Sequence, residues 1–201
     1  MVTLAELVIA DTPDAWEALG FDVEGDACRV GAVTLRLAGP ERGDGIVEWS
    51  LAGADAAPEL DGLPTRLFGG AAAPPEPVQH PNGALQIDHV VVSTGDLDTT
   101  IASLEAGGIE LRRLAAERAP RMAFFRLGEV ILEVVEREPA APMAFWGLVV
   151  VVPDLDALAA DLGERLSPVH EAVQQGRRIA TVRELAGVSP ALAFMSPPHR
   201  A

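Results

Sequence analysis

One histidine and one glutamate in the second half of the chain have residue types and positions that suit a chemical site. His89 lies in one short apolar run and Glu133 lies in another. Because side chains alternate between the two faces of a strand, His89 shares a face with Ile87 and Val91, and both polar residues lie opposite the valines that suit a core. An imidazole and a carboxylate on one face suit two ligands of a divalent metal or an acid/base pair. Both chemistries stay open at this point.

Each of these side chains also has an ordinary structural explanation. His89 suits a hydrogen-bonded strand residue, and Glu133 suits a carboxylate in a solvated groove. Trp146 and Phe124 suit the lining of a ligand pocket, but aromatic residues in apolar strands are more common in a core. The sequence alone does not decide between these readings.

Two pairs of adjacent arginines suit an acidic ligand. They lie at residues 112–113 and 177–178, each within an expected strand. Alternation along a strand more often places one arginine of each pair in water. The pairs therefore do not select a function by themselves.

A repeat along the chain indicates which elements hold these residues. The apolar runs at 87–92 and 146–151 are each followed by Asp-Leu-Asp, at 96–98 and at 154–156. An aspartate at this place caps a helix, and the residues that follow have helical periodicity. Further apolar runs predict strands at 109–113, 122–127 and 129–135 after the first helix, and at 177–183 and 191–195 after the second. The sequence therefore predicts an α+β fold of repeated β-α-β-β-β modules.

The repeat divides the chain into four segments. Residues 1–53 form a degenerate N-terminal module, 54–83 form a linker rich in Ala, Pro and Gly, and 84–138 and 139–201 form two clear modules. In the first segment we expect strands at 4–10, 21–23, 27–30, 33–37 and 45–51.

The composition excludes several partners and settings. The 15 basic residues are all Arg and face 30 acidic residues, and the net charge of −15 repels the phosphates of nucleic acids. The single Cys28 excludes an internal disulfide. The acidic start does not resemble a signal peptide, and the apolar runs are too short to span a bilayer, so we expect a cytoplasmic protein with no membrane partner. The absence of Lys and Tyr indicates a high-GC bacterial genome.

The histidine of a first strand, the glutamate of a fourth strand and the repeated modules together resemble the vicinal oxygen chelate superfamily, which includes glyoxalase, bleomycin-resistance and extradiol-dioxygenase proteins. The segment His80-Pro81-Asn82-Gly83 also looks like segments of bacterial glyoxalase-like proteins. The resemblance covers residues 79–197 and, more faintly, 3–52. It implies a bowl-shaped cleft in which two paired modules each supply two ligands to a divalent metal, here His89 and Glu133 from one module, and a small-molecule substrate binds through neighbouring oxygens.

The chain departs from that pattern in its last module. Gly147 replaces the first-strand ligand, and Ala193 lies near the place of the fourth-strand carboxylate, so residues 139–201 form a module that lacks metal ligands. A complete site would have to recruit Glu6, Glu48, water or a second subunit.

The N-terminal module offers another arrangement. As the partner of residues 84–138, it would bring Glu6 opposite His89 and Arg36 opposite Glu133, where Arg36 would pair with that carboxylate. Both residues are therefore candidate ligand-binding residues, together with Trp146 and Phe124.

The resemblance implies three functions. The first is a metal-dependent lyase, isomerase or dioxygenase with Glu133 as a catalytic residue, and the second is a non-catalytic protein that sequesters a small molecule in the same cleft. The third is a structural or regulatory partner with a vestigial site. Three modules leave one concave sheet unpaired, so we also predict a homodimer.

Overall fold

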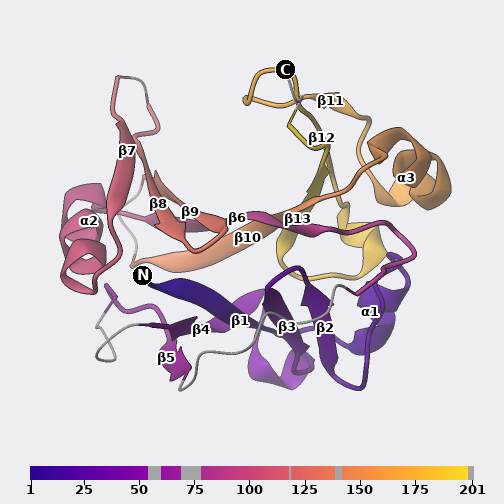
Figure 1. The fold of residues 1–201 in the computed structure, drawn as a ribbon, viewed down its shortest axis with the longest axis horizontal. Coiled ribbons are helices and arrows are strands. Elements are labelled where there is room, and N and C mark those ends of the chain that lie inside the picture. The colour runs from indigo at the N-terminus through magenta and orange to yellow at the C-terminus, as the bar shows by residue number, and fades with distance from the viewer. Residues whose placement is uncertain (54–59, 69–77, 118, 139–141, 199–201) are drawn as a thin grey trace.

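The computed structural model describes residues 1–53, 60–68, 78–117, 119–138 and 142–198, which form two β-sheets flanked by short helices (Figure 1). The smaller sheet has the strand order β2-β3-β1-β4-β5. Its elements are β1 (Thr3–Ile9), α1 (Pro13–Glu17), β2 (Ala27–Val30), β3 (Val33–Leu37), the 3-10 turn η1 (Pro40–Arg42), β4 (Ile46–Ala52) and β5 (Thr65–Phe68).

The larger sheet contains the two clear modules and has the strand order β11-β12-β13-β10-β6-β9-β8-β7. The first module comprises β6 (Gln86–Thr94), α2 (Leu97–Ala106), β7 (Leu111–Ala115), β8 (Met122–Leu127) and β9 (Val130–Glu136). The second comprises β10 (Ala144–Val151), α3 (Leu155–Leu162), η2 (Gly163–Arg165), β11 (His170–Glu171), β12 (Arg178–Thr181), η3 (Glu184–Ala186) and β13 (Ala191–Met195). Both modules have the same internal strand order, and β6 and β10 join them as an antiparallel pair. The predicted α+β class and its β-α-β-β-β modules are confirmed.

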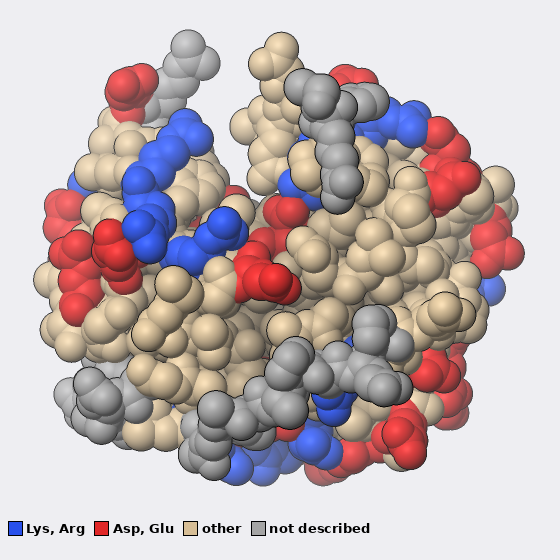
Figure 2. Space-filling model, in the orientation of Figure 1, with Lys and Arg blue, Asp and Glu red and all other residues tan. Residues whose placement is uncertain are grey.

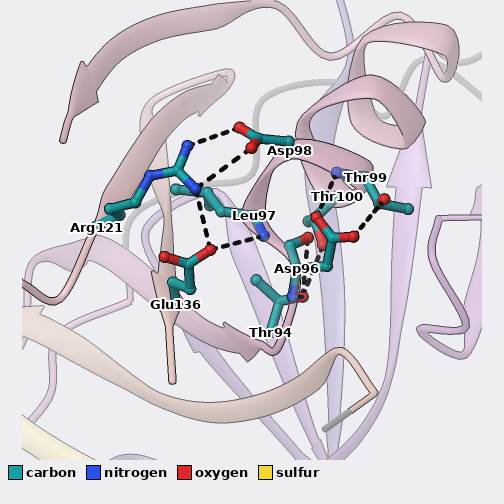
Figure 3. Close-up of polar contacts among 8 residues, drawn as sticks. All are labelled: Thr94, Asp96, Leu97, Asp98, Thr99, Thr100, Arg121 and Glu136. Atoms are coloured by element: carbon teal, nitrogen blue, oxygen red, sulfur yellow. Dashed lines mark hydrogen bonds and ion pairs between the residues drawn. The ribbon is translucent and has the colours of Figure 1, made fainter. Parts of the chain in front are cut away.

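Of the two aspartates that the sequence offers as a cap for helix α2, Asp96 and Asp98, the first one caps it. Asp96 Oδ1 accepts a hydrogen bond from the backbone N–H of Thr99 at 3.0 Å. Glu136, at the end of β9, accepts from the backbone N–H of Leu97 at 3.3 Å and from Arg121 at 3.1 Å (Figure 3). The start of the helix is thereby tied to the strand beneath it. Asp154 caps α3 in the same way, accepting from the backbone N–H of Ala157 at 2.9 Å.

The smaller sheet repeats the register of the larger one strand by strand. β1 runs parallel to β3 with Val8 opposite Arg36, as β6 runs parallel to β9 with Val91 opposite Glu133. β1 runs antiparallel to β4 with Val8 opposite Glu48, as β6 runs antiparallel to β10 with Val91 opposite Gly147. The smaller sheet is therefore a shortened copy of the larger one.

The β-bulges repeat as well. In the larger sheet, Asp88 on β6 and Trp146 on β10 are the extra residues, which have no partner opposite. In the smaller sheet, Ala5 on β1 and Val47 on β4 hold the equivalent places. A bulge changes the bend and twist of its strand, so bulges at matching positions give the two sheets the same local shape.

Strand β5 changes two expectations. It lies within the predicted linker at 54–83, which is therefore not a plain loop at residues 65–68; residues 54–59 and 69–77 lie outside the described part of the chain. β5 runs parallel to β4, with Ser50 opposite Arg66, as β13 runs parallel to β10 with Val149 opposite Ala193. The chain thus contains parts of a fourth module, where the sequence indicated three.

The fourth module removes one argument for self-association. β1 pairs with β4, so the first module has its partner within the chain. The homodimer stays a prediction, without the unpaired sheet that suggested it.

One shared core joins the two sheets. The apolar faces of β1, β3 and β4 and those of β6, β9 and β10 belong to one buried cluster, in which Trp49 meets Phe145 edge to face at 5.4 Å between ring centroids. Phe21 also packs there, and no strand forms at residues 21–23. In Figure 1 the arms of the larger sheet rise away from the smaller sheet, leaving an open concave side. No helix among the described residues is long and apolar enough to cross a membrane.

Candidate functional site

His89 and Glu133 lie on the concave face of the larger sheet, in two neighbouring rows of side chains. Glu133 on β9 is opposite Val91 of β6 and Phe124 of β8. His89 on β6 is opposite Ile131 of β9. The alternate residues of both strands, such as Val90 and Leu132, are fully buried in the shared core. The structure therefore brings the two predicted site residues to one face.

A β-bulge places a carboxylate beside the histidine. β10 pairs Val149 with His89 and Val150 with Ile87, which leaves Asp88 as the extra residue. Asp88 Oδ2 lies 2.8 Å from His89 Nδ1. The bulge also shifts the alternation, so Ile87 packs in the core and does not share the face of His89 as predicted.

Arg177 holds this carboxylate from the other module. Its Nη1 donates to Asp88 Oδ1 at 2.6 Å and to Gln174 Oε1 at 2.8 Å, and its Nε donates to the carbonyl oxygen of Ser196 at 2.8 Å. Arg177 is only 7% exposed, whereas its neighbour Arg178 points outward to Asp156. The two arginines of this pair thus point to different surroundings as expected, but no local pattern in the sequence indicates that the buried one meets Asp88.

These contacts fix the proton arrangement of His89. Burial alone would raise the pKa of Asp88, but hydrogen bonds from His89 and Arg177 outweigh it and hold that pKa below its ordinary value. An ionised carboxylate only accepts hydrogen bonds, so Nδ1 of His89 carries the proton and Nε2 carries the lone pair. No hydrogen bond within the described part of the chain occupies Nε2. Such an imidazole can act as a base or a metal ligand.

The surroundings of Glu133 shift its pKa in the opposite direction to that of Asp88. Burial raises its pKa, the charge of His89 lowers it by a smaller amount, and the charge of Asp88 raises it further. The carboxyl group therefore keeps its proton to a higher pH than an ordinary glutamate. A base and a carboxylic acid on one face have the two roles that proton transfer requires. His89 itself is only 8% exposed, and Glu133 but not His89 lines the cleft described next.

A cleft of about 1050 Å³ opens over Glu133. Its walls come from β7, β8 and β9 on one side and from the loop between β11 and β12, at residues 173–175, on the other. Phe124 lines it as predicted, with the guanidinium of Arg113 5.5 Å from the centre of its ring. The volume is suited to a small organic molecule.

The other predicted ligand-binding residues lie elsewhere. Trp146 is the extra residue of the bulge in β10, is 45% exposed and stacks with Arg137 at 4.6 Å, and it is not among the residues that line this cleft. Glu6 and Arg36 belong to the smaller sheet and pair with each other at 3.1 Å. Arg36 also pairs with Asp26 at 2.8 Å. The proposed pairing of Arg36 with Glu133 was wrong, because β10 and not β1 is the neighbour of β6.

Comparison with solved structures identifies the fold to which this architecture belongs. A xylose isomerase-like TIM barrel/4-hydroxyphenylpyruvate dioxygenase fusion protein is similar over 99% of this chain and 49% of its own, with a TM-score of 0.66 and 10% sequence identity. The chain spans about half the length of that protein. The chain has the vicinal oxygen chelate fold.

Other structures similar to parts of this vicinal oxygen chelate fold are two methylmalonyl-CoA epimerases. The Mycobacterium tuberculosis protein has a TM-score of 0.48 and 18% identity over 58% of this chain and 91% of its own. A Streptomyces coelicolor variant has a TM-score of 0.47 and 22% identity over 58% of this chain and 99% of its own. No protein-family model and no curated protein matches the sequence.

The donor set does not fit the four-ligand metal site that the vicinal oxygen chelate resemblance implies. Gly147 occupies one ligand position, and a Cβ atom there would lie 2.0 Å from the carbonyl oxygen of Ala191, so no side chain fits. Ala193 has no donor atom in its side chain. Within the described ranges, no group of three or more His, Cys, Asp and Glu residues is placed to hold a metal ion. His89 and Glu133 alone fall short of the three or four protein ligands usual for zinc.

Proposed function

We propose that the protein binds a small organic molecule in the cleft of the larger sheet and transfers a proton on it, as an isomerase or lyase. The observation that carries the proposal is the orientation of His89 by Asp88, which is itself held by Arg177. A histidine whose Nδ1 is fixed by a carboxylate has a defined tautomer, with the lone pair of the neutral ring on Nε2. Glu133, on the same face, supplies the proton donor.

The proposed step needs no cofactor. Nε2 of His89 accepts a proton from a carbon next to a substrate carbonyl, and the electron pair of that C–H bond moves toward the carbonyl oxygen. Glu133, in its protonated form, gives its proton to the substrate. Asp88 stabilises the imidazolium that forms. The raised pKa of Glu133 favours this form, since a neutral carboxylic acid is the proton donor.

A non-catalytic binder that uses the same cleft is the second candidate. The lining of the cleft favours it, because Glu133 is the one carboxylate among the described residues that line it and His89 is not part of that lining. Such a surface contributes binding and no chemistry.

Exchange in deuterated water separates the candidates. We would incubate the protein with a panel of 2-oxo acids and acyl thioesters and follow loss of the α-proton by NMR. Proton transfer predicts exchange that falls about 10² to 10⁴-fold in His89→Gln. A binder predicts ligand-induced thermal stabilisation without exchange.

Metal analysis of protein purified without chelators completes this test. A stoichiometric divalent metal, lost in His89→Gln and Glu133→Gln, would contradict the acid/base assignment and restore the metal-dependent reading. Exchange that survives extensive chelation supports the assignment.

A further inference from the structure

The cleft has the opposite charge sign to the rest of the molecule. Its lining contains three arginines, Arg112, Arg113 and Arg126, and one carboxylate, Glu133. The whole chain has 15 arginines and 30 acidic residues. Figure 2 shows arginine side chains gathered along one side of the hollow at the top, with acidic side chains at its foot and along the left and right edges of the molecule. A positive cleft in a strongly acidic protein counteracts the long-range repulsion that an anion would meet.

Two of these arginines lie in the rows of the candidate site. Arg113 of β7 is opposite Phe124, which is opposite Glu133. Arg126 of β8 is opposite Ile131, which is opposite His89. Each arginine is thus two strands away from its polar counterpart, which is about 10 Å between backbones at the usual strand spacing. A ligand a few bonds long spans that distance.

The charges of Arg113 and Arg126 have no carboxylate partner within the described residues. Arg113 lies over the ring of Phe124, and Arg126 donates to the carbonyl oxygen of Glu129 at 3.3 Å. Arg112, by contrast, pairs with Glu110 at 3.1 Å. Arg113 and Arg126 therefore keep donors for a ligand, and a guanidinium binds carboxylate, sulfonate and phosphate groups through paired N–H donors.

The other half of the concave face is apolar. Val149, Ala193 and Met195 form a buried cluster separate from the shared core, with Ala172 and Ile179 packed against it. Phe124 adds an aromatic surface on the arginine side. The cluster itself is at most 7% exposed and does not line the cleft, so the second module contributes only residues 173–175 to the lining that a ligand meets.

We propose that the ligand of the cleft is an organic anion, whose acidic group binds Arg113 and Arg126 and whose apolar part lies along Phe124 toward the second module. This inference rests on the proposed function, because it assigns a chemical class to the molecule that occupies the same cleft.

Two fluorescent probes of nearly equal shape test the assignment. Anilinonaphthalene sulfonate is an aromatic anion, and phenylnaphthylamine is its neutral counterpart without the sulfonate. The wild-type protein binds the sulfonate at least tenfold more tightly in low salt, and added NaCl weakens the sulfonate alone. In Arg113→Gln/Arg126→Gln the sulfonate binds at least tenfold more weakly, while affinity for the neutral probe changes less than twofold.

Arg29→Gln is the matched control, because Arg29 holds the place in the smaller sheet that Arg126 holds in the larger one. Arg29 on β2 is opposite Thr34 of β3, as Arg126 on β8 is opposite Ile131 of β9. It leaves both affinities unchanged. Equal binding of both probes to the wild type, or unchanged sulfonate binding in the double variant, overturns the anion assignment and leaves the proposed function standing. Binding of neither probe contradicts the proposed use of the cleft itself, and the anion assignment with it.

Discussion

Replacing Arg177 with methionine should destabilise the fold far more than any replacement of an exposed arginine. The change leaves the carboxylate of Asp88 without its cationic partner, while Asp88 has only 11% of its side chain exposed. Breaking one side of a buried pair costs about 3–5 kcal/mol, because the remaining charge stays desolvated. For a chain of this length, that loss lowers the melting temperature by about 6–20 °C.

Arg178→Met provides the control at the adjacent position. Arg178 pairs with Asp156 at 2.5 Å, but the two side chains are 42% and 63% exposed. An exposed pair contributes little to stability, because water and salt screen its charges. Urea unfolding of both variants, followed by circular dichroism, measures the difference.

A double-mutant cycle then isolates the pair itself. Arg177→Met combined with Asp88→Asn should destabilise less than the sum of the single changes, with a coupling of about 0.5–3 kcal/mol. Additive effects, or an Arg177→Met variant as stable as Arg178→Met, would show that the contact does not carry the stability assigned to it.

Three further changes test the site and the sheet. Because the folded-state pKa of Asp88 is lowered, its stabilising contribution is present at neutral pH and is lost as pH falls below about 4; Asp88→Asn should flatten the unfolding free energy over this range. The folded-state pKa of Glu133 is raised, so its contribution is complete below its unfolded pKa and declines as pH rises through the folded value; Glu133→Gln should therefore stabilise at pH 8 relative to wild type, with little effect at pH 4. Gly147→Ala should destabilise by about 1–3 kcal/mol, because the added methyl meets the carbonyl of Ala191 at 2.0 Å.

Each of these expectations has a contrary outcome. An Asp88→Asn variant with the full acid dependence of wild type would place the acid-sensitive group elsewhere. A Glu133→Gln variant that is less stable at pH 8 would mean that the ionised carboxylate has a partner the assignment lacks. A stable Gly147→Ala variant would mean that β10 and β13 separate easily.

Much of the fold could be predicted from the sequence, because the patterns that indicate helices and strands are local. Each Asp-Leu-Asp segment located the start of a helix to within two residues, and the apolar runs predicted β8 and β13 with the residues observed. β5 was missed because four residues in a segment rich in Ala, Pro and Gly give no clear alternation.

The chemical site was only partly predictable. His89 and Glu133 followed from strand alternation, but Asp88 became a partner of His89 through a bulge, which depends on how β6 and β10 align. Arg177 reaches Asp88 from 89 residues further along the chain, and no local pattern reports such a contact. The glycine at 147 was read as a missing ligand, whereas its cause is the close approach of β13.

Equivalent positions in the two sheets carry different residues. The places held by His89, Glu133, Gly147 and Ala193 in the larger sheet are held by Glu6, Arg36, Glu48 and Arg66 in the smaller one. There the four residues cancel one another in two ion pairs, of 3.1 and 2.6 Å.

Because the chain contains two similar sheets, one of them can keep a purely structural role. The smaller sheet can act as a scaffold at the back of the larger sheet, and the larger sheet can then keep a desolvated acid that a lone domain would tolerate less well. Substitutions in the smaller sheet should accordingly lower the amount of folded protein in the cell, and substitutions at the site of the larger sheet should abolish the proposed function.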